Sequence, residues 1–494
     1  ICRRDSSEPQ AAACVFDYRT GELKAIVGGR YKPTTRKTLN RASGMTMPVG
    51  SSIKPLAVYG PAIEGGLAPG SVMYDTRSPI RNWDTDYGYP RNYNDKGYVG
   101  EMTLRTAITK STNTVAAQLL MYYVGGETAA NTLVNLGIDP SHIEHDGPGL
   151  ALGASGITPL EMAGAYSALA NMGQYIQPIS FTKIVDKDGN TVLNMLDRQE
   201  RRQVFKPSTS YMMIDMLQYA LKTNRSKALI SGQTVGGKTG TVMKSRGIAF
   251  SGFSGYYACS VWIGSDKFKS LSSSTTGASH AAGLWHDIME PLHEGLPDRP
   301  IADTDAASLG ITRVKFCKYS GQLANESCPE TVEDIGLYSD LVTDRCTSHQ
   351  YVTVCSETGG LATEACPSTK QITLLSLPLK GQLPFMYKNY HEIYAQYWPD
   401  PDEPLVECGK HAGTWDDEVA RKYEWKHKSA ALINKANERI KDGGLSQEAL
   451  DTLNAHISEL KNICADLNSV TSAQIITAYN ALGNYLKSLN PNNQ

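Results

Sequence analysis

A serine and a lysine lie one helical turn apart in the apolar segment "VGSSIKPLAVYG", residues 49–60. Ser51 and Lys54 are residues i and i+3, so on a helix their side chains lie on the same side and can meet. A serine hydroxyl is a weak nucleophile until a neighbouring base takes its proton. A lysine becomes such a base when apolar surroundings and nearby cations lower its pKa. The pattern therefore predicts Ser51 as a nucleophile and Lys54 as its base.

Ser-x-x-Lys alone is a weak signal, since an exposed helix start with a solvated lysine also produces it. Residues 180–183 and 458–461 show the same spacing. Two further motifs add weight. Ser111-Thr112-Asn113 lies between two helical patterns, where helix N-capping is the ordinary alternative. Lys238-Thr239-Gly240 occurs once and opens a β-like run, where an edge strand protected by a lysine is the alternative.

These motifs in this order form the signature of β-lactamases and penicillin-binding proteins. Residues from about 9 to 297 resemble the transpeptidase domain of a class A penicillin-binding protein. The segments that carry the resemblance are residues 39–66, 89–114, 150–173 and 236–241. The resemblance implies an α/β (α+β) fold, in which an antiparallel sheet is flanked by helices and joined to an all-helical subdomain.

The resemblance also implies roles for the three motifs. Ser51 would be acylated, Lys54 would be the general base, and Ser111 would relay a proton to the leaving amine. Asn113 would hydrogen-bond the substrate backbone, and Lys238 would keep positive potential in the cleft. No metal and no cofactor are expected in this chemistry.

Further residues of the resembling segments would contact the substrate. Thr239 and Thr241 would hold its terminal carboxylate, and Gly240 would let a backbone approach closely. The N–H groups of Ser51 and Thr241 would form the oxyanion hole. The groove wall would include Trp83, Asn92 and Tyr93, for which ordinary loop packing is the alternative.

The expected activity is that of a D,D-transpeptidase, which cross-links peptidoglycan stem peptides on nascent glycan strands through an acyl-serine intermediate at D-Ala-D-Ala. β-Lactams would acylate the same serine. The alternatives are a D,D-carboxypeptidase, a β-lactam or wall-fragment sensor without turnover, a scaffold and a serine β-lactamase. The last needs a glutamate for its water, and Glu161 lies in a helix-periodic segment that predicts packing instead.

One segment departs from the family pattern. After residues 238–241 the family has an Asp-x-Trp-Phe strand, whereas this chain has "VMKSRGIAFSGFSGYY". Residues 248–250 take the strand position, and Arg246 lies nearby. The core chemistry is unaffected, but a different shape is expected for this edge of the cleft.

The predicted domains are a transpeptidase domain over residues 1–300, β-rich modules over 301–400, a linker over 401–415 and a helical bundle over 416–494. In the last, apolar residues at 3-4-3-4-3 spacing predict one face of a three-helix bundle, with Cys464 in its core.

The chain begins Ile-Cys-Arg-Arg, which predicts a truncated chain. Its missing upstream part would hold a glycosyltransferase domain and an anchor on the outer face of the cytoplasmic membrane.

Ten cysteines are present, and four of them form a repeat with the pattern C-x2-[ST]-G-x-L-A-[NT]-x2-C-P. The repeated pairs are Cys317 with Cys328 and Cys355 with Cys366. Paired cysteines in small modules favour disulfides and an oxidising compartment. Zinc is the alternative, because two C-x2-H pairs, Cys346 with His349 and Cys408 with His411, lie nearby.

The composition excludes other classes of function. Hydrophobic residues make up 41% and charged residues 20% of the 494 residues, which is typical of a globular chain of about three domains. The net charge of −2 and the lack of a long basic run give no indication of nucleic-acid binding.

Overall fold

A computed structural model describes residues 9–33, 35–75, 80, 90–93, 98–145, 147–341, 345–346, 349–375, 407–411, 417–441 and 443–489. Contacts group the chain into two units. The first is Ile1–Ala324 with Glu330–Arg345, and the second is Asn325–Pro329 with Cys346–Gln494. The predicted Trp83 and the predicted linker, apart from its residues 407–411, lie outside the described residues. The predicted domain boundaries stay predictions.

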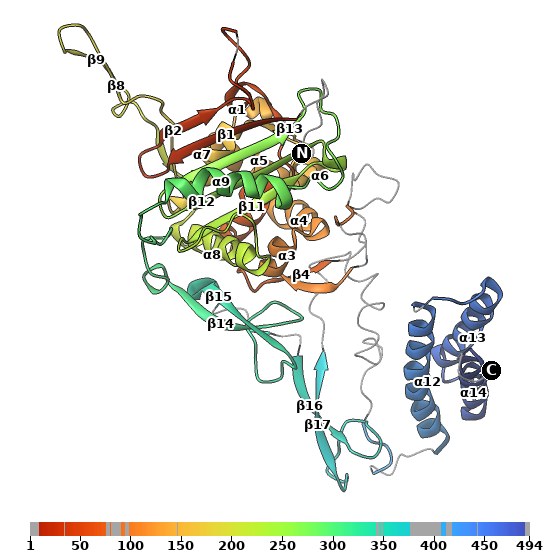
Figure 1. The fold of residues 1–494 in the computed structure, drawn as a ribbon. Coiled ribbons are helices and arrows are strands. Elements are labelled where there is room, and N and C mark those ends of the chain that lie inside the picture. Colours follow the sequence, from red (N-terminus) through yellow and green to blue (C-terminus); the bar gives the residue numbers. More distant parts are fainter. Residues whose placement is uncertain are drawn as a thin grey trace. The chain divides into compact units, whose positions relative to one another are not determined.

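A five-stranded antiparallel sheet with the order β11-β12-β13-β1-β2 runs through the first unit (Figure 1). Its strands are β1 (Gln10–Asp17), β2 (Glu22–Val27), β11 (Val235–Thr241), β12 (Gly247–Ser254) and β13 (Ala258–Gly264). β1 lies between β2 and β13, so strands from both ends of the predicted domain share one sheet. This arrangement confirms the predicted fold class.

Helices cover both faces of this sheet. Alternate residues of β1 point to opposite faces: Ala13 and Val15 pack with Trp285 of α9 (Ala282–Leu292), whereas Ala12 and Cys14 pack with Ala163 of α7 (Pro159–Ala170). The first of these two faces is also covered by α8 (Pro207–Thr223). Because both faces are covered, the central strands are buried and hold the Lys238 strand rigidly.

The all-helical part contains α2 (Gly60–Glu64), α3 (Leu104–Lys110), α4 (Asn113–Leu119), α5 (Gly126–Asn135) and α6 (Gly147–Leu152). The second motif lies between α3 and α4, in agreement with the two helical patterns seen in the sequence. The chain turns at Ser111, whose φ of 57° is left-handed. This conformation is uncommon outside glycine, and it turns the chain between α3 and α4. We call residues 111–113 the elbow.

Shorter elements complete the first unit. They are α1 (Arg41–Gly44), β3 (Met47–Pro48), β4 (Val72–Asp75), β5 (Gly100–Thr103), β6 (Gly156–Ile157), β7 (Gln174–Ile176), β8 (Lys183–Val185), β9 (Thr191–Asn194), β10 (Arg201–Gln203), β14 (Ile311–Cys317), β15 (Thr331–Leu337) and α10 (Tyr338–Leu341). Arg105 on α3 contacts Asp215 of α8 and Asp334 of β15, each at 2.6 Å. These ion pairs hold the β14–β15 hairpin against the helices.

The second unit contains a hairpin and a helical bundle. The hairpin is formed by β16 (His349–Cys355) and β17 (Thr369–Leu375), and the helices are α12 (Asp417–Lys441), α13 (Gln447–Ala465) and α14 (Ser472–Ser488). Cys464 is 7% exposed and packs in the core of the bundle, as its place in the apolar stripe predicted. Among the described residues, no helix has the length and apolarity of a membrane span.

Candidate active site

The predicted nucleophile lies at the start of a buried helical segment. Ser51 is half-buried in the 3-10 turn η1 (Gly50–Ile53), which continues into η2 (Pro55–Tyr59) and α2. Gly50 has a φ of +57°, and a Cβ at this position would lie 2.9 Å from the carbonyl oxygen of Thr241. Only glycine fits this turn, because any side chain would strike the strand that carries the third motif.

Lys54 is fully buried and bonded to the elbow. Its Nζ donates to the backbone oxygen of Ser111 at 2.9 Å, to that of Thr112 at 3.3 Å and to Oδ1 of Asn113 at 2.7 Å. Among the described residues, Lys54 Nζ makes no hydrogen bond to Ser51. The first and second motifs are thus joined through Lys54.

The elbow also meets the third motif. Lys238 on β11 is 5% exposed, and its Nζ donates to the hydroxyl oxygen of Ser111 at 2.9 Å. Thr112 does not cap α4 with its side chain. The capping alternative suggested by the sequence is therefore wrong for this residue, and the elbow instead brings Ser111 between the two lysines.

The electrostatics of this pair are unusual for lysines. Burial lowers the pKa of Lys54 well below its usual range, and the charge of Lys238 lowers it further. Burial also lowers the pKa of Lys238, to about 8. Burial disfavours the charged form of both amines, and the charge of Lys238 also disfavours that of Lys54, so Lys54 is the lysine whose neutral form is favoured more.

Backbone contact fixes the Lys238 strand against the nucleophile turn. A Cβ at Gly240 would lie only 2.0 Å from the carbonyl oxygen of Val49. The backbone that approaches Gly240 closely in this structure is therefore that of Val49, in the same chain. The hydroxyl oxygen of Thr241 accepts a hydrogen bond from the N–H of Gly277 at 3.1 Å, which joins β11 to η6 (Gly277–Ala281).

A buried carboxylate supports the elbow from the other side, and sequence reasoning missed it. Asp75, 3% exposed, accepts from Asn92 Nδ2 at 2.7 Å and from the hydroxyl of Thr114 at 2.5 Å. Asn92 Oδ1 accepts from the N–H of Asn113 at 2.9 Å, so Asn92 caps α4 from a distant segment. In a sequence, a helix cap is recognised by an Asn or Asp residue directly before the helix. Asn92 is too far from α4 in sequence to be recognised in this way.

A cavity of about 780 Å³ adjoins the elbow and the Lys238 strand. Its lining includes Ser111, Lys238, Thr239, Asn92 and Tyr93. The side chain of Tyr93 is 70% exposed at this cavity. Of the predicted groove residues, Asn92 and Tyr93 are thus placed beside the motifs.

The segment that departs from the family pattern forms a short connection between β11 and β12. Two of its residues, Lys244 and Ser245, have left-handed φ values of 58° and 50°. The guanidinium of Arg246 lies 5.4 Å from the ring centre of Phe268. Arg246 is thus held by an aromatic neighbour at the end of the Lys238 strand.

Glu161 has a structural position. Its carboxylate accepts from the N–H of Thr158 at 2.9 Å, completing a capping box at the start of α7, and contacts His142 Nδ1 at 2.8 Å. This agrees with the packing role that its helix periodicity predicted.

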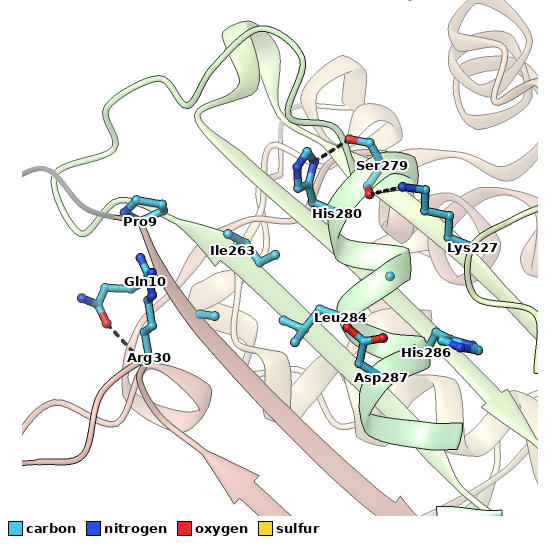
Figure 2. Close-up of a pocket in the computed structure, with 12 residues that line it drawn as sticks. Pro9, Gln10, Arg30, Lys227, Ile263, Ser279, His280, Leu284, His286 and Asp287 are labelled. Atoms are coloured by element: carbon cyan, nitrogen blue, oxygen red, sulfur yellow. Dashed lines mark hydrogen bonds between the residues drawn. The ribbon is translucent and has the colours of Figure 1, made fainter. Parts of the chain in front are cut away.

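A second cavity, of about 680 Å³, borders the first, and Lys227 and Ser279 line both (Figure 2). Residues of β1, β13 and α9 complete its described lining, among them Asp287 of α9. The residues of the three motifs are not among those that line it in the described part of the chain.

Comparisons with known proteins identify relatives of this chain. The profile of the penicillin-binding protein transpeptidase domain matches residues 11–256. Penicillin-binding protein 1A of Clostridium acetobutylicum is 35% identical over 317 residues, which are 62% of this chain and 38% of that protein. Penicillin-binding protein 1F of Bacillus subtilis is 33% identical over 294 residues, 58% of this chain and 39% of that protein. The chain spans about two fifths of the length of these relatives.

Solved structures show the same fold. Penicillin-binding protein 1A from Haemophilus influenzae has a TM-score of 0.59 at 24% identity, covering 68% of this chain and 54% of its own. PonA1 from Mycobacterium tuberculosis, solved in complex with penicillin V, has a TM-score of 0.53 at 22% identity, covering 60% and 81%. Residues 11–256 of this chain therefore form a transpeptidase domain of the penicillin-binding protein family.

Proposed function

We propose that this chain is a D,D-transpeptidase that cross-links peptidoglycan stem peptides through an acyl-serine intermediate on Ser51. The observation that carries the proposal is the buried pair of lysines, Lys54 and Lys238, on either side of Ser111 and next to the nucleophile turn. Two buried cations are costly unless one gives up its proton. A neutral lysine beside a serine is the base that acyl transfer needs.

In the acylation step, Ser51 Oγ attacks the carbonyl carbon of the D-Ala-D-Ala amide and its proton passes to Lys54. The C–N bond then breaks, and the leaving amine of D-Ala takes a proton through Ser111. Ser111 fits this relay because its oxygen accepts from Lys238 and its backbone carbonyl accepts from Lys54. In the second step, an amine of a neighbouring stem peptide attacks the acyl-serine and frees Ser51.

The hydrogen bonds of Lys54 support its proposed role as a base. An ammonium has three N–H donors, and Lys54 has three acceptors. A neutral amine has two donors and a lone pair, so one of these bonds must be released. The longest, 3.3 Å to Thr112, is the weakest. Its release leaves the lone pair available for the Ser51 proton.

The remaining motif residues would bind the substrate. The backbone N–H groups of Ser51 and Thr241 would stabilise the oxyanion, and the hydroxyls of Thr239 and Thr241 would hold the terminal carboxylate. Asn113 already accepts from Lys54 and donates to the carbonyl oxygen of Arg91 at 2.7 Å. We expect its contact with substrate to replace the Arg91 bond.

The proposed partners follow from this chemistry: stem peptides on glycan strands, and β-lactams as inhibitors. Such substrates place the protein outside the cytoplasmic membrane. A D,D-carboxypeptidase would use the same first step with water as the acceptor. The position of Glu161 in a helix cap disfavours a class A β-lactamase, which needs a glutamate for deacylation.

The test is intact-protein mass spectrometry after incubation with benzylpenicillin. We expect one covalent adduct on the wild type and on Ser52→Ala, and none on Ser51→Ala. Ser52 is the matched control, because its neighbouring hydroxyl is buried and bonded to the carbonyl of Val49 at 2.8 Å. An adduct that survives Ser51→Ala would refute the assignment of the nucleophile.

Two other outcomes separate the alternatives. Hydrolysis of penicillin without a lasting adduct would support a β-lactamase. For an acylated enzyme, a D-Ala-D-Ala pentapeptide with an added acceptor amine distinguishes cross-linking from hydrolysis. If only the shortened peptide forms, the carboxypeptidase alternative replaces the transpeptidase.

A further inference from the structure

The second unit holds a group of side chains that acyl transfer does not use. Three thiols and one imidazole gather there, with their ligand atoms all within 4.8 Å of one another: Cys355, Cys366, Cys408 and His411. We call this group the Cys-His quartet. His411 Nδ1 lies 3.2 Å from Cys408 Sγ and 3.5 Å from Cys355 Sγ. Cys355 and Cys408 are buried.

We propose that the second unit binds one Zn²⁺ ion at the Cys-His quartet, as a closed structural site. In a tetrahedral zinc site, Zn–S bonds of about 2.3 Å and Zn–N bonds of about 2.0 Å set the ligand atoms about 3.5–3.8 Å apart. The 3.5 Å from His411 Nδ1 to Cys355 Sγ lies in this range, the 3.2 Å to Cys408 Sγ is slightly shorter, and all four ligand atoms lie within 4.8 Å of one another. Three cysteines with one histidine is a common structural zinc set, and four protein ligands leave no open position for catalysis.

A disulfide explains the group less well. It would join two of the three sulfurs at about 2.05 Å and leave one thiol and the imidazole without a role. In the structure, Cys355, Cys366 and Cys408 are not joined by disulfides. The disulfide that the sequence repeat favoured is therefore replaced in our proposal by the zinc alternative.

The groups around the quartet are those that a metal site needs. The N–H of Thr363 donates to Cys366 Sγ at 3.3 Å, and the hydroxyl of Thr358 donates to Cys408 Sγ at 3.2 Å. Such donors stabilise thiolates. His411 presents its other nitrogen, Nε2, to the carboxylate of Glu357 at 3.5 Å. A carboxylate behind a ligating histidine fixes the ring and its tautomer.

The hairpin also lacks another source of stability. From Tyr351 to Thr373, all of which the structure describes, only Val354 and Cys355 are buried. So small an apolar core cannot hold a module together, and small modules of this kind depend on disulfides or metals. Zinc would bind residues 407–411 to the hairpin, since the quartet draws ligands from both segments. Binding would displace the thiol protons.

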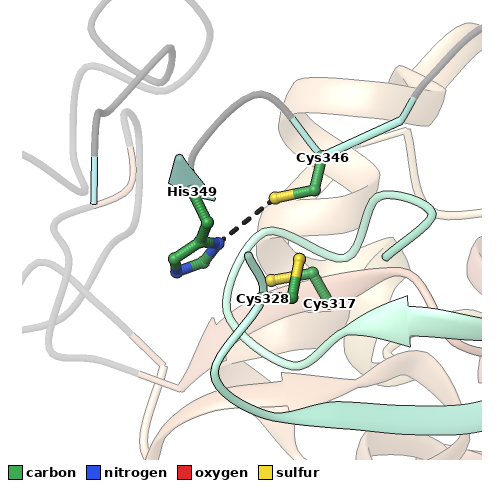
Figure 3. A group of neighbouring side chains, drawn as sticks. All are labelled: Cys317, Cys328, Cys346 and His349. Atoms are coloured by element: carbon green, nitrogen blue, oxygen red, sulfur yellow. Dashed lines mark hydrogen bonds between the residues drawn. The ribbon is translucent and has the colours of Figure 1, made fainter. Parts of the chain in front are cut away.

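The first sequence repeat shows the same local geometry. The N–H of Asn325 lies 3.3 Å from Cys328 Sγ, as Thr363 does from Cys366. Cys346 Sγ lies 3.2 Å from His349 Nδ1, which is also the separation of Cys408 and His411 (Figure 3). Because the two repeats have the same arrangement, we expect each to bind the same kind of ligand. Cys317 corresponds to Cys355 by its place in the repeat.

The experiment uses the full chain, purified under reducing conditions, supplied with ZnSO₄ and desalted. Bound zinc is measured by inductively coupled plasma mass spectrometry. We expect Cys366→Ser and His411→Ala each to lose about one zinc ion per chain relative to the wild type. Cys464→Ala, which removes a buried thiol from the bundle core, should lose none. A wild type without zinc, or variants that keep all of it, would overturn the proposal.

A second measurement keeps the test decisive if the variants do not fold. Iodoacetamide labelling of the wild type, mapped by peptide mass spectrometry, reports each thiol separately. We expect zinc to slow the labelling of Cys366 and Cys408, and a chelator to restore it. Cys464 should be indifferent to both. Labelling that zinc does not change, or a Cys355–Cys366 disulfide mapped without reductant, would contradict the site.

Discussion

The candidate active site and the Cys-His quartet hold buried polar side chains in opposite ways. In the first unit, Lys54 and Lys238 are fixed by an extensive apolar core and by backbone acceptors. Around the quartet, residues 351–373 contain only two buried side chains, and in our proposal the order of the module rests on its ligand side chains. A rigid scaffold can thus force charges into an unfavourable place and make them reactive. A module without a core needs polar groups whose own chemistry stabilises it.

The largest effect is expected from Lys54→Met. The substitution removes the base but keeps much of the side-chain volume, so penicillin acylation should fall by about 10²–10⁴-fold. Three unpaired acceptors should cost some stability, about 1–3 kcal/mol for each group left unsatisfied, offset by relief of the buried charge. Stopped-flow acylation and thermal unfolding measure the two effects. Lys461→Met is the matched control, since it has the same Ser-x-x-Lys spacing on an exposed helix face and should change neither.

Two glycines test the contrast between core and module. Gly240→Ala would place a Cβ 2.0 Å from Val49 O, so we expect a loss of about 3 kcal/mol of stability and about a hundredfold in acylation. Gly359→Ala meets no atom within 4 Å and carries only the strain of a φ of +76°, about 1 kcal/mol. Denaturant unfolding with local probes separates the two. Equal losses of stability for Gly240→Ala and Gly359→Ala would contradict the expected difference between the core and the module.

The pH dependence of acylation should follow the two lysines. The rate should rise with pH as Lys54 becomes neutral, because only the neutral amine accepts a proton. It should fall above about pH 8, where Lys238 loses its proton and its positive charge, by about tenfold per pH unit. Lys238→Met should abolish the alkaline fall. It should also move the rising limb to higher pH, since the Lys238 charge lowers the pKa of Lys54. An alkaline fall that persists in this variant would assign it to another group.

The smallest effect on acylation is expected from chelation. Removing zinc with a strong chelator should leave the penicillin reaction unchanged within about twofold, because the fold of the first unit rests on its own core. Limited proteolysis at residues 349–375 should become faster at the same time. A parallel loss of acylation would show that the two regions depend on each other.

Local patterns were sufficient to predict the fold class and to locate the three motifs. The helix periodicity of the Glu161 segment, which forms α7, and the apolar stripe that contains Cys464 both reflect burial, which a sequence shows directly. The spacing of Ser51 and Lys54 predicted a reactive turn, and the structure places both residues in one buried helical segment. Long-range pairing was not predictable. Asn92 was expected in the groove wall, and no local signal showed that it would cap α4 and bind Asp75.

The same limit applies to the cysteines. The repeat showed that Cys355 and Cys366 form a unit, but the closure of that unit by Cys408 and His411 is a matter of three-dimensional proximity. The left-handed Ser111 is a further example. The sequence next to Ser111 did not predict that conformation. The left-handed φ changes the chain direction between the end of α3 and the start of α4.

The contact of Gly240 with Val49, and that of Gly50 with Thr241, consist of main chain. Main chain offers no side chain to exchange, and glycine at these positions cannot be enlarged without a clash. Single substitutions at these positions therefore cannot change the shape of this junction of the cleft in small steps. Resistance to a β-lactam that relies on it would have to arise elsewhere, from exposed wall residues such as Tyr93 that a single substitution can alter at little cost.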